Sequence, residues 1–290
     1  MRKTLLSVAV AGAFVVPALA VAADAAPTPT HTFTGNVGFA TDYLYRGISQ
    51  TSGKPALQGG FDYSHASGLY AGTWASNVSW IQDGLNVPGA LTTTSAGLEI
   101  DVYGGYKGTV MGDLGFDVGV LTYNYPGHNK TPGGIIKQDT QELYGALSWK
   151  WLTVKYSHSL GALFGWAKTD DAGVTPFPFQ KTSGSGYLEA NLAFDLGNGW
   201  GVTGHVGHQK VKGYGNASYS DYKLGATKDV GFGTFGLALS TTKAKDDCGA
   251  IASAARVATQ EPYCWGGAVP GAVNYSAGKS TAVLTFSKTF

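Results

Sequence analysis

Strict alternation marks the segment Leu98-Glu99-Ile100-Asp101-Val102-Tyr103. Leu, Ile and Val occupy one face of this segment, whereas Glu, Asp and Tyr occupy the other. Because successive side chains of a strand point to opposite sides, a period of two predicts a β-strand with one apolar and one polar face. The same alternation returns in four further segments, at 114–120, 188–195, 235–240 and 282–287.

Weaker copies of this alternation bring the number of expected strands to twelve, an even number. They lie near 33–45, 56–64, 69–78, 141–148, 152–159, 200–209 and 221–228. The expected strands have roughly 8–13 residues, close to the ~9–11 residues that a tilted strand needs to cross a bilayer. No sustained helical periodicity follows the first residues of the chain.

The connectors between these strands alternate in length. The long ones lie at 46–55, 79–94, 125–139, 160–184, 210–220 and 241–280. The short ones lie around 65–68, 105–112, 149–151, 196–199 and 229–233. This sorting predicts an all-β fold, a transmembrane antiparallel up-and-down β-barrel with short periplasmic turns and long extracellular loops. A soluble β-sandwich gives no reason to sort its loops in this way.

Composition agrees with a strand-rich membrane protein. Of 290 residues, 43 are glycine, 12% are aromatic and only 13% are charged. The aromatic content argues against disorder, and the net charge of +1 argues against a nucleic-acid partner. A lipid-facing half of each strand accounts for the low charge, and aromatic girdles at the two membrane interfaces account for many Tyr and Trp residues.

The first residues predict export. Arg2 and Lys3 precede an apolar stretch at 5–16, and small residues suited to cleavage follow at 18–22. This stretch ends at Pro17 and is shorter than the ~20 residues of a membrane anchor, so 1–22 is interpreted as a signal peptide. Residues 23–31 then form a short periplasmic segment, and 32–290 form the barrel. The expected location is the bacterial outer membrane, with its lipid as a partner.

If the apolar face of each strand meets lipid, the polar face lines the lumen. Acidic residues predominate among the charged side chains expected there. The carboxylates are Asp42, Asp62, Glu99, Asp101, Asp117, Glu142, Glu189 and Asp195, and the basic residues are Arg46, Lys155 and Lys223. An acidic lumen predicts a weak preference for cations. The alternative is that these side chains pair with one another in a plugged interior.

Two features near the end of the chain carry further predictions. Cys248 and Cys264 share the last long loop, and an oxidising compartment favours a disulfide over free thiols or a metal clip. The chain ends on Phe290, which continues the apolar face of the last expected strand. Such a terminal strand is the signal expected for the outer-membrane assembly machinery, although Lys288 interrupts its apolar spacing.

Several segments resemble the TorF family of outer-membrane porins. The similarity is strongest in Gly35–Thr51, Pro55–Tyr63 and Gly68–Val78. It continues in Glu99–Tyr106, Asp117–Val120 and Leu284–Phe290, and the long last loop departs from it. The resemblance implies a porin fold and no catalytic residues.

We therefore expect a porin-like channel for passive diffusion of small solutes, without enzymatic activity, cofactor or metal. One alternative is an outer-membrane lipid or peptide hydrolase, for which His158 with Ser157 or Ser159 is the local candidate. Others are a plugged structural or adhesive barrel and a soluble secreted β protein. The apolar loop 161–184 could enter the lumen, pack on other loops or bind a partner. His205 and His208 are expected on opposite faces of a strand.

Overall fold

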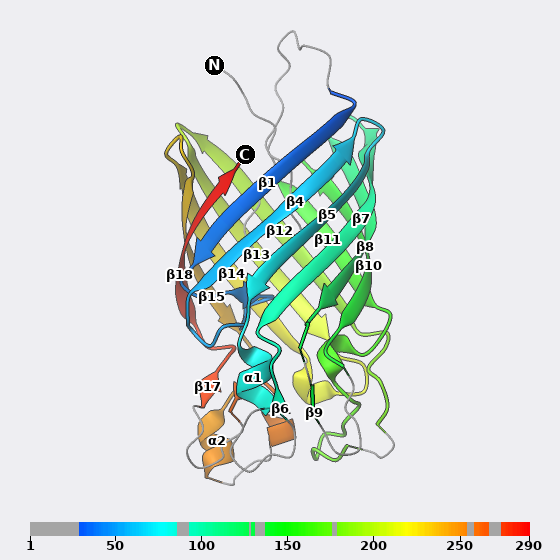
Figure 1. The fold of residues 1–290 in the computed structure, drawn as a ribbon, viewed down its shortest axis with the longest axis vertical. Coiled ribbons are helices and arrows are strands. Elements are labelled where there is room, and N and C mark those ends of the chain that lie inside the picture. Colours follow the sequence, from blue (N-terminus) through cyan, green and yellow to red (C-terminus); the bar gives the residue numbers. More distant parts are fainter. Residues whose placement is uncertain are drawn as a thin grey trace.

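The computed structural model describes residues 29–85, 93–127, 129–130, 137–175, 179–253, 258–266 and 274–290. The signal peptide expected at 1–22 and the first part of the segment expected at 23–31 lie outside these residues. Twelve antiparallel strands form one closed barrel, in which neighbours around the ring follow one another along the chain (Figure 1). The predicted all-β, 12-stranded up-and-down barrel is confirmed.

The barrel strands are tilted and range from 8 residues in β11 to 14 residues in β7. They are β1 (His31–Ala40), β4 (Ala56–His65), β5 (Leu69–Asn77), β7 (Leu98–Met111), β8 (Leu114–Asn124), β10 (Thr140–Trp149), β11 (Leu152–Ser159), β12 (Gly186–Gly197), β13 (Trp200–Lys210), β14 (Tyr219–Asp229), β15 (Thr234–Thr242) and β18 (Thr281–Thr289). The first and last strands close the ring, and the register pairs Asn36 with Thr289 and Ala40 with Thr285.

Six long loops connect the strands at one end of the barrel, and five short turns connect them at the other (Figure 1). Loops 1 to 6 are residues 41–55, 78–97, 125–139, 160–185, 211–218 and 243–280. Within them lie β2 (Leu44–Tyr45), β3 (Ile48–Ser49), α1 (Trp80–Leu85), β6 (Thr93–Thr94), β9 (Asn129–Lys130), η1 (Leu163–Gly165), η2 (Gly215–Ala217), α2 (Cys248–Ala252), η3 (Ala258–Gln260), β16 (Cys264–Trp265) and β17 (Tyr275–Ser276). In the described part of the chain, no helix is long and apolar enough to cross a membrane.

Two strand boundaries differ from the sequence-based prediction. The connector expected at 105–112 is instead strand, since β7 runs on to Met111 and turns at Gly112 and Asp113. Glycine accounts for this continuation, because Gly108 leaves room for the ring of Phe116 on the next strand. The strand expected at 33–45 ends at Ala40, and the residues beyond it belong to loop 1.

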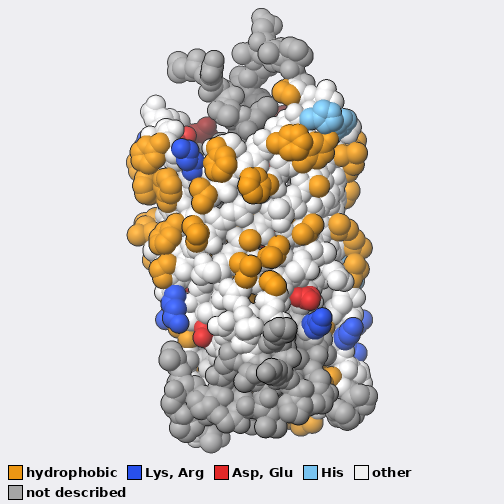
Figure 2. All heavy atoms as spheres, viewed as in Figure 1, with side chains coloured by type: hydrophobic (Ala, Val, Ile, Leu, Met, Phe, Trp, Pro, Cys, Tyr) orange, Lys and Arg blue, Asp and Glu red, His pale blue; other side chains and the backbone are white. Residues whose placement is uncertain are grey.

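Apolar side chains cover the outside of the barrel wall. On β7, Val102 is 51% exposed whereas the neighbouring Asp101 is fully buried, and the other strands alternate in the same way. Figure 2 shows these apolar side chains across the face formed by the first strands. Exposed apolar surface on this scale is the property of a barrel wall that contacts lipid.

Inside the barrel, tyrosine rings lie across glycines of neighbouring strands. Tyr103 covers Gly72, and a methyl group added at Gly72 would lie 2.5 Å from the Tyr103 ring. Tyr70 covers Gly105 in the same manner, from the opposite direction. These glycines are needed because the rings occupy the space of a Cβ atom, so part of the high glycine content serves close packing of the wall.

Replacement of Gly72 by Ala is therefore expected to destabilise the barrel by about 1–3 kcal/mol, as overpacking of an interior does. The added methyl group displaces the Tyr103 ring, whose hydroxyl donates to Asp62 at 2.5 Å. The measurement is the temperature at which the folded species is lost in gels of unheated protein. Gly145→Ala is the control, because its methyl group meets only Val118, at 3.9 Å. Equal melting of the two variants would contradict the prediction.

Candidate functional site

The lumen and the loops that cover it form the candidate site. Of the predicted lumen residues, eight lie on strand positions whose side chains face the interior: Asp62, Glu99, Asp101, Asp117, Glu142, Lys155, Glu189 and Lys223. Their neighbours along each strand carry the exposed apolar side chains. These side chains share the inner face of their strands because the side-chain period of a strand is two.

The three other predicted lumen residues, Asp42, Arg46 and Asp195, lie in loop 1 or at the end of a strand. Asp195 is exposed near a short turn, where its carboxylate accepts a hydrogen bond from the Gly197 amide at 2.8 Å. Asp42 lies in loop 1 and accepts from the hydroxyls of Ser49 and Thr51 at 2.6 and 2.9 Å. Burial raises the pKa of Asp42 above its usual range, although these hydroxyl donors favour the charged form.

Arg46 reaches the lumen from loop 1 rather than from a strand. It lies at the tip of the β2–β3 hairpin and, like Gly47, has a positive φ. Its guanidinium pairs with both carboxylate oxygens of Glu142, at 2.8 and 3.1 Å, and donates to Gln209 at 2.7 Å. Its charged carbon lies 4.2 Å from the centre of the Tyr187 ring. This bidentate, buried pair holds the hairpin in place.

Tyrosine hydroxyls bind most carboxylates on the wall formed by β4 to β8. Tyr103 donates to Asp62 and Tyr70 donates to Asp117, each at 2.5 Å. Glu99 accepts from Tyr43 and Tyr125, each at 2.6 Å. Asp101 differs, because neither of its carboxylate oxygens has a hydrogen-bond partner among the described residues. The tyrosine hydroxyls hold Asp62, Glu99 and Asp117 in place without contributing a counter-charge.

The opposite wall carries a compact polar network around His205. One ring nitrogen lies 2.7 Å from Asp221 and the other 2.7 Å from the Asn191 side-chain oxygen. Tyr187 also donates to Asp221, at 2.9 Å, and so joins this network to Arg46. His208 faces outward and contacts Ser220, so the two histidines lie on opposite faces as their spacing predicts.

Sequence reasoning missed two charged interior residues. Asp221 lies two residues before Lys223 on β14 and therefore shares its face, so the period-two pattern could have found it. Lys107 lay within the connector expected at 105–112, but it is paired in register with Asp117 and its ammonium lies 5.3 Å from the centre of the Tyr70 ring. The interior tyrosines carry no comparable signal, because Tyr is common in strands of every kind.

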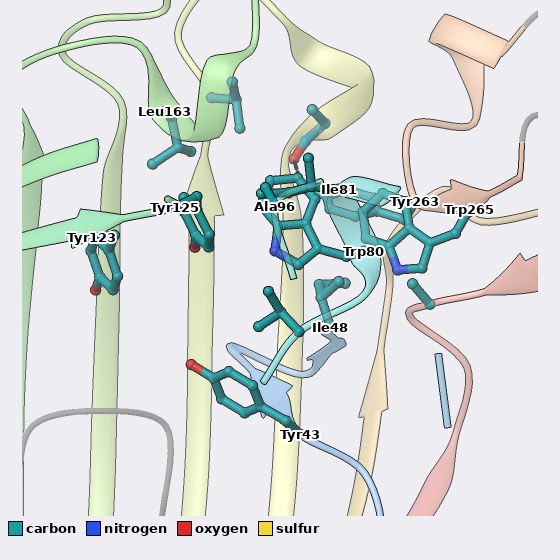
Figure 3. Packing of buried hydrophobic residues seen from close by; sticks show 14 of the residues in the cluster. Tyr43, Ile48, Trp80, Ile81, Ala96, Tyr123, Tyr125, Leu163, Tyr263 and Trp265 are labelled. Carbon is teal, nitrogen blue, oxygen red and sulfur yellow. Dashed lines mark hydrogen bonds between the residues drawn. The ribbon is translucent and has the colours of Figure 1, made fainter. Parts of the chain in front are cut away.

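The six loops meet in one packed cluster, here called the loop cap (Figure 3). Each loop contributes buried side chains, namely Tyr43 and Ile48, Trp80 and Ile81, Tyr125, Leu163, Tyr214 and Ala217, and Tyr263 and Trp265. Phe164 contacts four aromatic rings within it, those of Tyr45, Trp80, Tyr123 and Tyr125. A cavity of about 40 Å³ remains in the cap, room for little more than water.

Loop 4 therefore packs on other loops, which is one of the three arrangements predicted for it. Trp166 contacts the rings of Tyr214 and Tyr263, while Pro176, Phe177 and Pro178 lie outside the described residues. Within the cap, loop 6 is held to loop 1 by the indole of Trp265, which donates to the Ser49 carbonyl at 3.0 Å. Burial raises the pKa of the Tyr263 hydroxyl well above its usual range, so the group stays protonated as the donor to Ala217.

A disulfide joins Cys248 of α2 to Cys264 of β16. Trp265 follows Cys264 directly, so the covalent link anchors the part of loop 6 that enters the cap. At the end of the chain, Phe290 and Gly35 exchange two backbone hydrogen bonds, of 2.8 and 2.9 Å, and thus extend the contact between the first and last strands. Recognition of Phe290 by assembly machinery stays a prediction.

The candidate hydrolase residues are not brought together. His158 faces outward, whereas Ser157 and Ser159 are buried on the inner face of β11. Within the described ranges, no group of three or more His, Cys, Asp or Glu side chains is arranged to hold a metal ion.

Comparison with known proteins gives one family match. The model of a family described as "Bacterial protein of unknown function (Gcw_chp)" matches residues 24–265. The TorF resemblance stays a prediction, since the matching model carries another name. No curated protein matches the chain.

Several solved structures are similar at low sequence identity. The KdgM porin is 6% identical with a TM-score of 0.47, over 89% of this chain and 99% of that chain. The NanC porin is 10% identical with a TM-score of 0.46, over 89% and 99% of the two chains. OprD of Pseudomonas aeruginosa is 13% identical with a TM-score of 0.37, over 91% and 68%.

Reduction of the Cys248–Cys264 disulfide is expected to speed protease cleavage within loop 6 at least about tenfold, because closure of a loop of this length contributes ~3 kcal/mol. The measurement is the rate of tryptic cleavage of the folded protein with and without reductant. The Cys248→Ser/Cys264→Ser variant should be cleaved fast under both conditions. Equal rates for oxidised and reduced protein would contradict this role, and two free thiols in unreduced protein would contradict the bridge.

Proposed function

We propose that this chain, which belongs to the Gcw_chp family of bacterial proteins of unknown function, is an outer-membrane channel of the porin type whose resting state is closed. Small polar solutes diffuse through the lumen when the loop cap opens, and no chemical bond is made or broken. The charged interior is the observation that carries the proposal. Charged side chains are costly to bury, so a barrel that served only as a filled scaffold would have no physical reason to place so many inside.

The exterior supports placement in the outer membrane. Apolar side chains such as Val102, Leu188 and Leu237 are about half exposed on the outer face of the wall. Exposure of such a surface to water is unfavourable, whereas its contact with lipid is not. The long loops then lie on the extracellular side and the short turns on the periplasmic side.

The charges of the lumen favour cations. Seven carboxylates face the interior from the strands, against three lysines and the loop residue Arg46. The carboxylates are Asp62, Glu99, Asp101, Asp117, Glu142, Glu189 and Asp221, and the lysines are Lys107, Lys155 and Lys223. The acidic residues outnumber the basic ones on the wall of β4 to β8, where tyrosine hydroxyls bind Asp62, Glu99 and Asp117 without supplying a counter-charge. Negative walls raise the local concentration of cations.

One observation favours a second candidate, a permanently plugged barrel with a structural or adhesive role. The loop cap buries side chains from all six loops, and the pocket among its aromatic rings has a volume of only about 40 Å³. The two candidates differ in whether the cap can move. Conductance measurements on the purified protein in planar bilayers separate them.

Open channels are expected to select cations over anions. In a salt gradient, the reversal potential should have the sign of cation selectivity, and Asp62→Asn/Asp117→Asn should move it towards zero. These two carboxylates lie on the acidic wall, each bound by a tyrosine that accommodates the amide. Asp113→Asn, at a short turn, is the control. Anion selectivity of the wild-type protein would contradict an acidic conduction path.

Loss of the Arg46–Glu142 pair is expected to raise the open probability several-fold. Arg46→Gln removes the bidentate contact that holds the β2–β3 hairpin in the lumen, and Arg46→Gln/Glu142→Gln does so without leaving a charge unpaired. Lys54→Gln is the matched control, because Lys54 is an exposed cation of the same loop. Folding of each variant is checked by its migration in unheated gels.

Three outcomes are informative. Raised conductance in both Arg46 variants supports a gate in loop 1. Unchanged conductance in a wild-type channel that does conduct contradicts that gate. Absence of conductance in the wild-type protein and in every folded variant contradicts the channel and supports the plugged barrel.

A further inference from the structure

The outer face of β11 to β13 changes from apolar to cationic toward the long loops. The register places Val154, Ala190 and Val206 in one row across these strands. The next row toward the loops is Tyr156, Leu188 and His208, and the last is His158, Gly186 and Lys210. This gradient matches the passage from the hydrocarbon layer of a membrane to its headgroups.

Four side chains at this edge, Tyr156, His158, Lys210 and Lys212, are here called the basic patch. His158 and Lys212 both lie close to Gly184, which has no side chain. A methyl group added at Gly184 would lie 3.3 Å from the Lys212 ammonium and 3.9 Å from the His158 ring. The Tyr156 hydroxyl lies 3.5 Å from Nδ1 of His158.

Gly186 lies between His158 and Lys210 in the sheet, where the Tyr156 hydroxyl occupies the place of a Cβ atom. The Tyr156 hydroxyl and the His158 ring therefore lie beside two residues, Gly184 and Gly186, that carry no side chain. A group that accepts several hydrogen bonds can reach these donors.

No carboxylate among the described residues neutralises this patch. The ion pairs within 4.0 Å in the described ranges involve Arg46 and His205, and both lie inside the barrel. Lys210 and Lys212 are exposed. The patch therefore presents positive charge outward at the boundary of the apolar wall.

We propose that the basic patch binds the phosphate group of an anionic lipid headgroup in the outer leaflet. This inference rests on the proposed placement of the barrel in the outer membrane. Lysine ammonium groups bind phosphate as point charges, while the Tyr156 hydroxyl and the His158 ring donate hydrogen bonds at its side. The position decides between lipid and a free anion, because the acyl chains of a bound lipid lie along the apolar rows below.

The test compares lipid retention by native mass spectrometry of barrels purified in detergent. The probe is a phosphorylated glycolipid, offered beside the same lipid after its phosphate groups have been removed. Lys210→Gln/Lys212→Gln should retain the phosphorylated lipid about 30-fold less well than wild type, since each lysine near a lipid surface contributes ~1 kcal/mol. Lys54→Gln/Lys243→Gln removes two exposed lysines near other strand ends and should retain it fully.

The outcomes separate the possible ligands. Equal retention by both double variants, or equal retention of lipid with and without phosphate, overturns the proposal. Competition by about 10-fold excess inorganic phosphate that abolishes lipid retention points to a free-anion site and also overturns it. Membrane fractionation and bilayer conductance of Lys210→Gln/Lys212→Gln should match wild type. If wild type itself fails those two measurements, the proposed function fails, independently of lipid retention.

Discussion

Closure of the hydrogen-bonded ring is the constraint on which the rest of this structure depends. Once β1 pairs with β18, each strand residue faces either the surroundings or the interior. The apolar half of each strand takes the outside, and the polar half is enclosed within the ring. The charges, tyrosines and glycines of the interior are therefore arranged by one geometric rule, and the loops that cover the space extend from the same rim.

The amino-acid sequence predicts the wall far better than the loop cap. Alternation depends only on neighbouring positions, so the period of two is sufficient to assign Glu99 and Asp101 to the interior. Loop contacts join residues that are far apart in the chain. No local pattern therefore predicts that Arg46 pairs with Glu142, 96 residues away. Lys107 was missed because glycine-rich sequence is typical of a turn, whereas here the glycines make room for aromatic rings of adjacent strands.

Tyrosine, arginine and histidine side chains each stabilise carboxylates in the interior. Tyrosine hydroxyls bind those on one wall, an arginine from loop 1 pairs with Glu142, and His205 binds Asp221 on the opposite wall. Because Tyr187 contacts both Arg46 and Asp221, the last two arrangements are physically connected. A change in the hairpin of loop 1 therefore alters contacts on both sides of the lumen. It also affects the loop cap, because Ile48 of this hairpin is one of the buried residues of the cap.

The exchange of hydrogen bonds between Gly35 and Phe290 has a consequence for how the molecule forms. Strands at the two extremes of the chain must meet, so a shortened or still growing chain leaves two open edges with unpaired amide and carbonyl groups. In a hydrocarbon layer those groups have no water to bind. The hydrogen-bonded ring is therefore complete only when the final strand pairs with the first. Until then, the open edges of a partly built barrel must be covered in some other way.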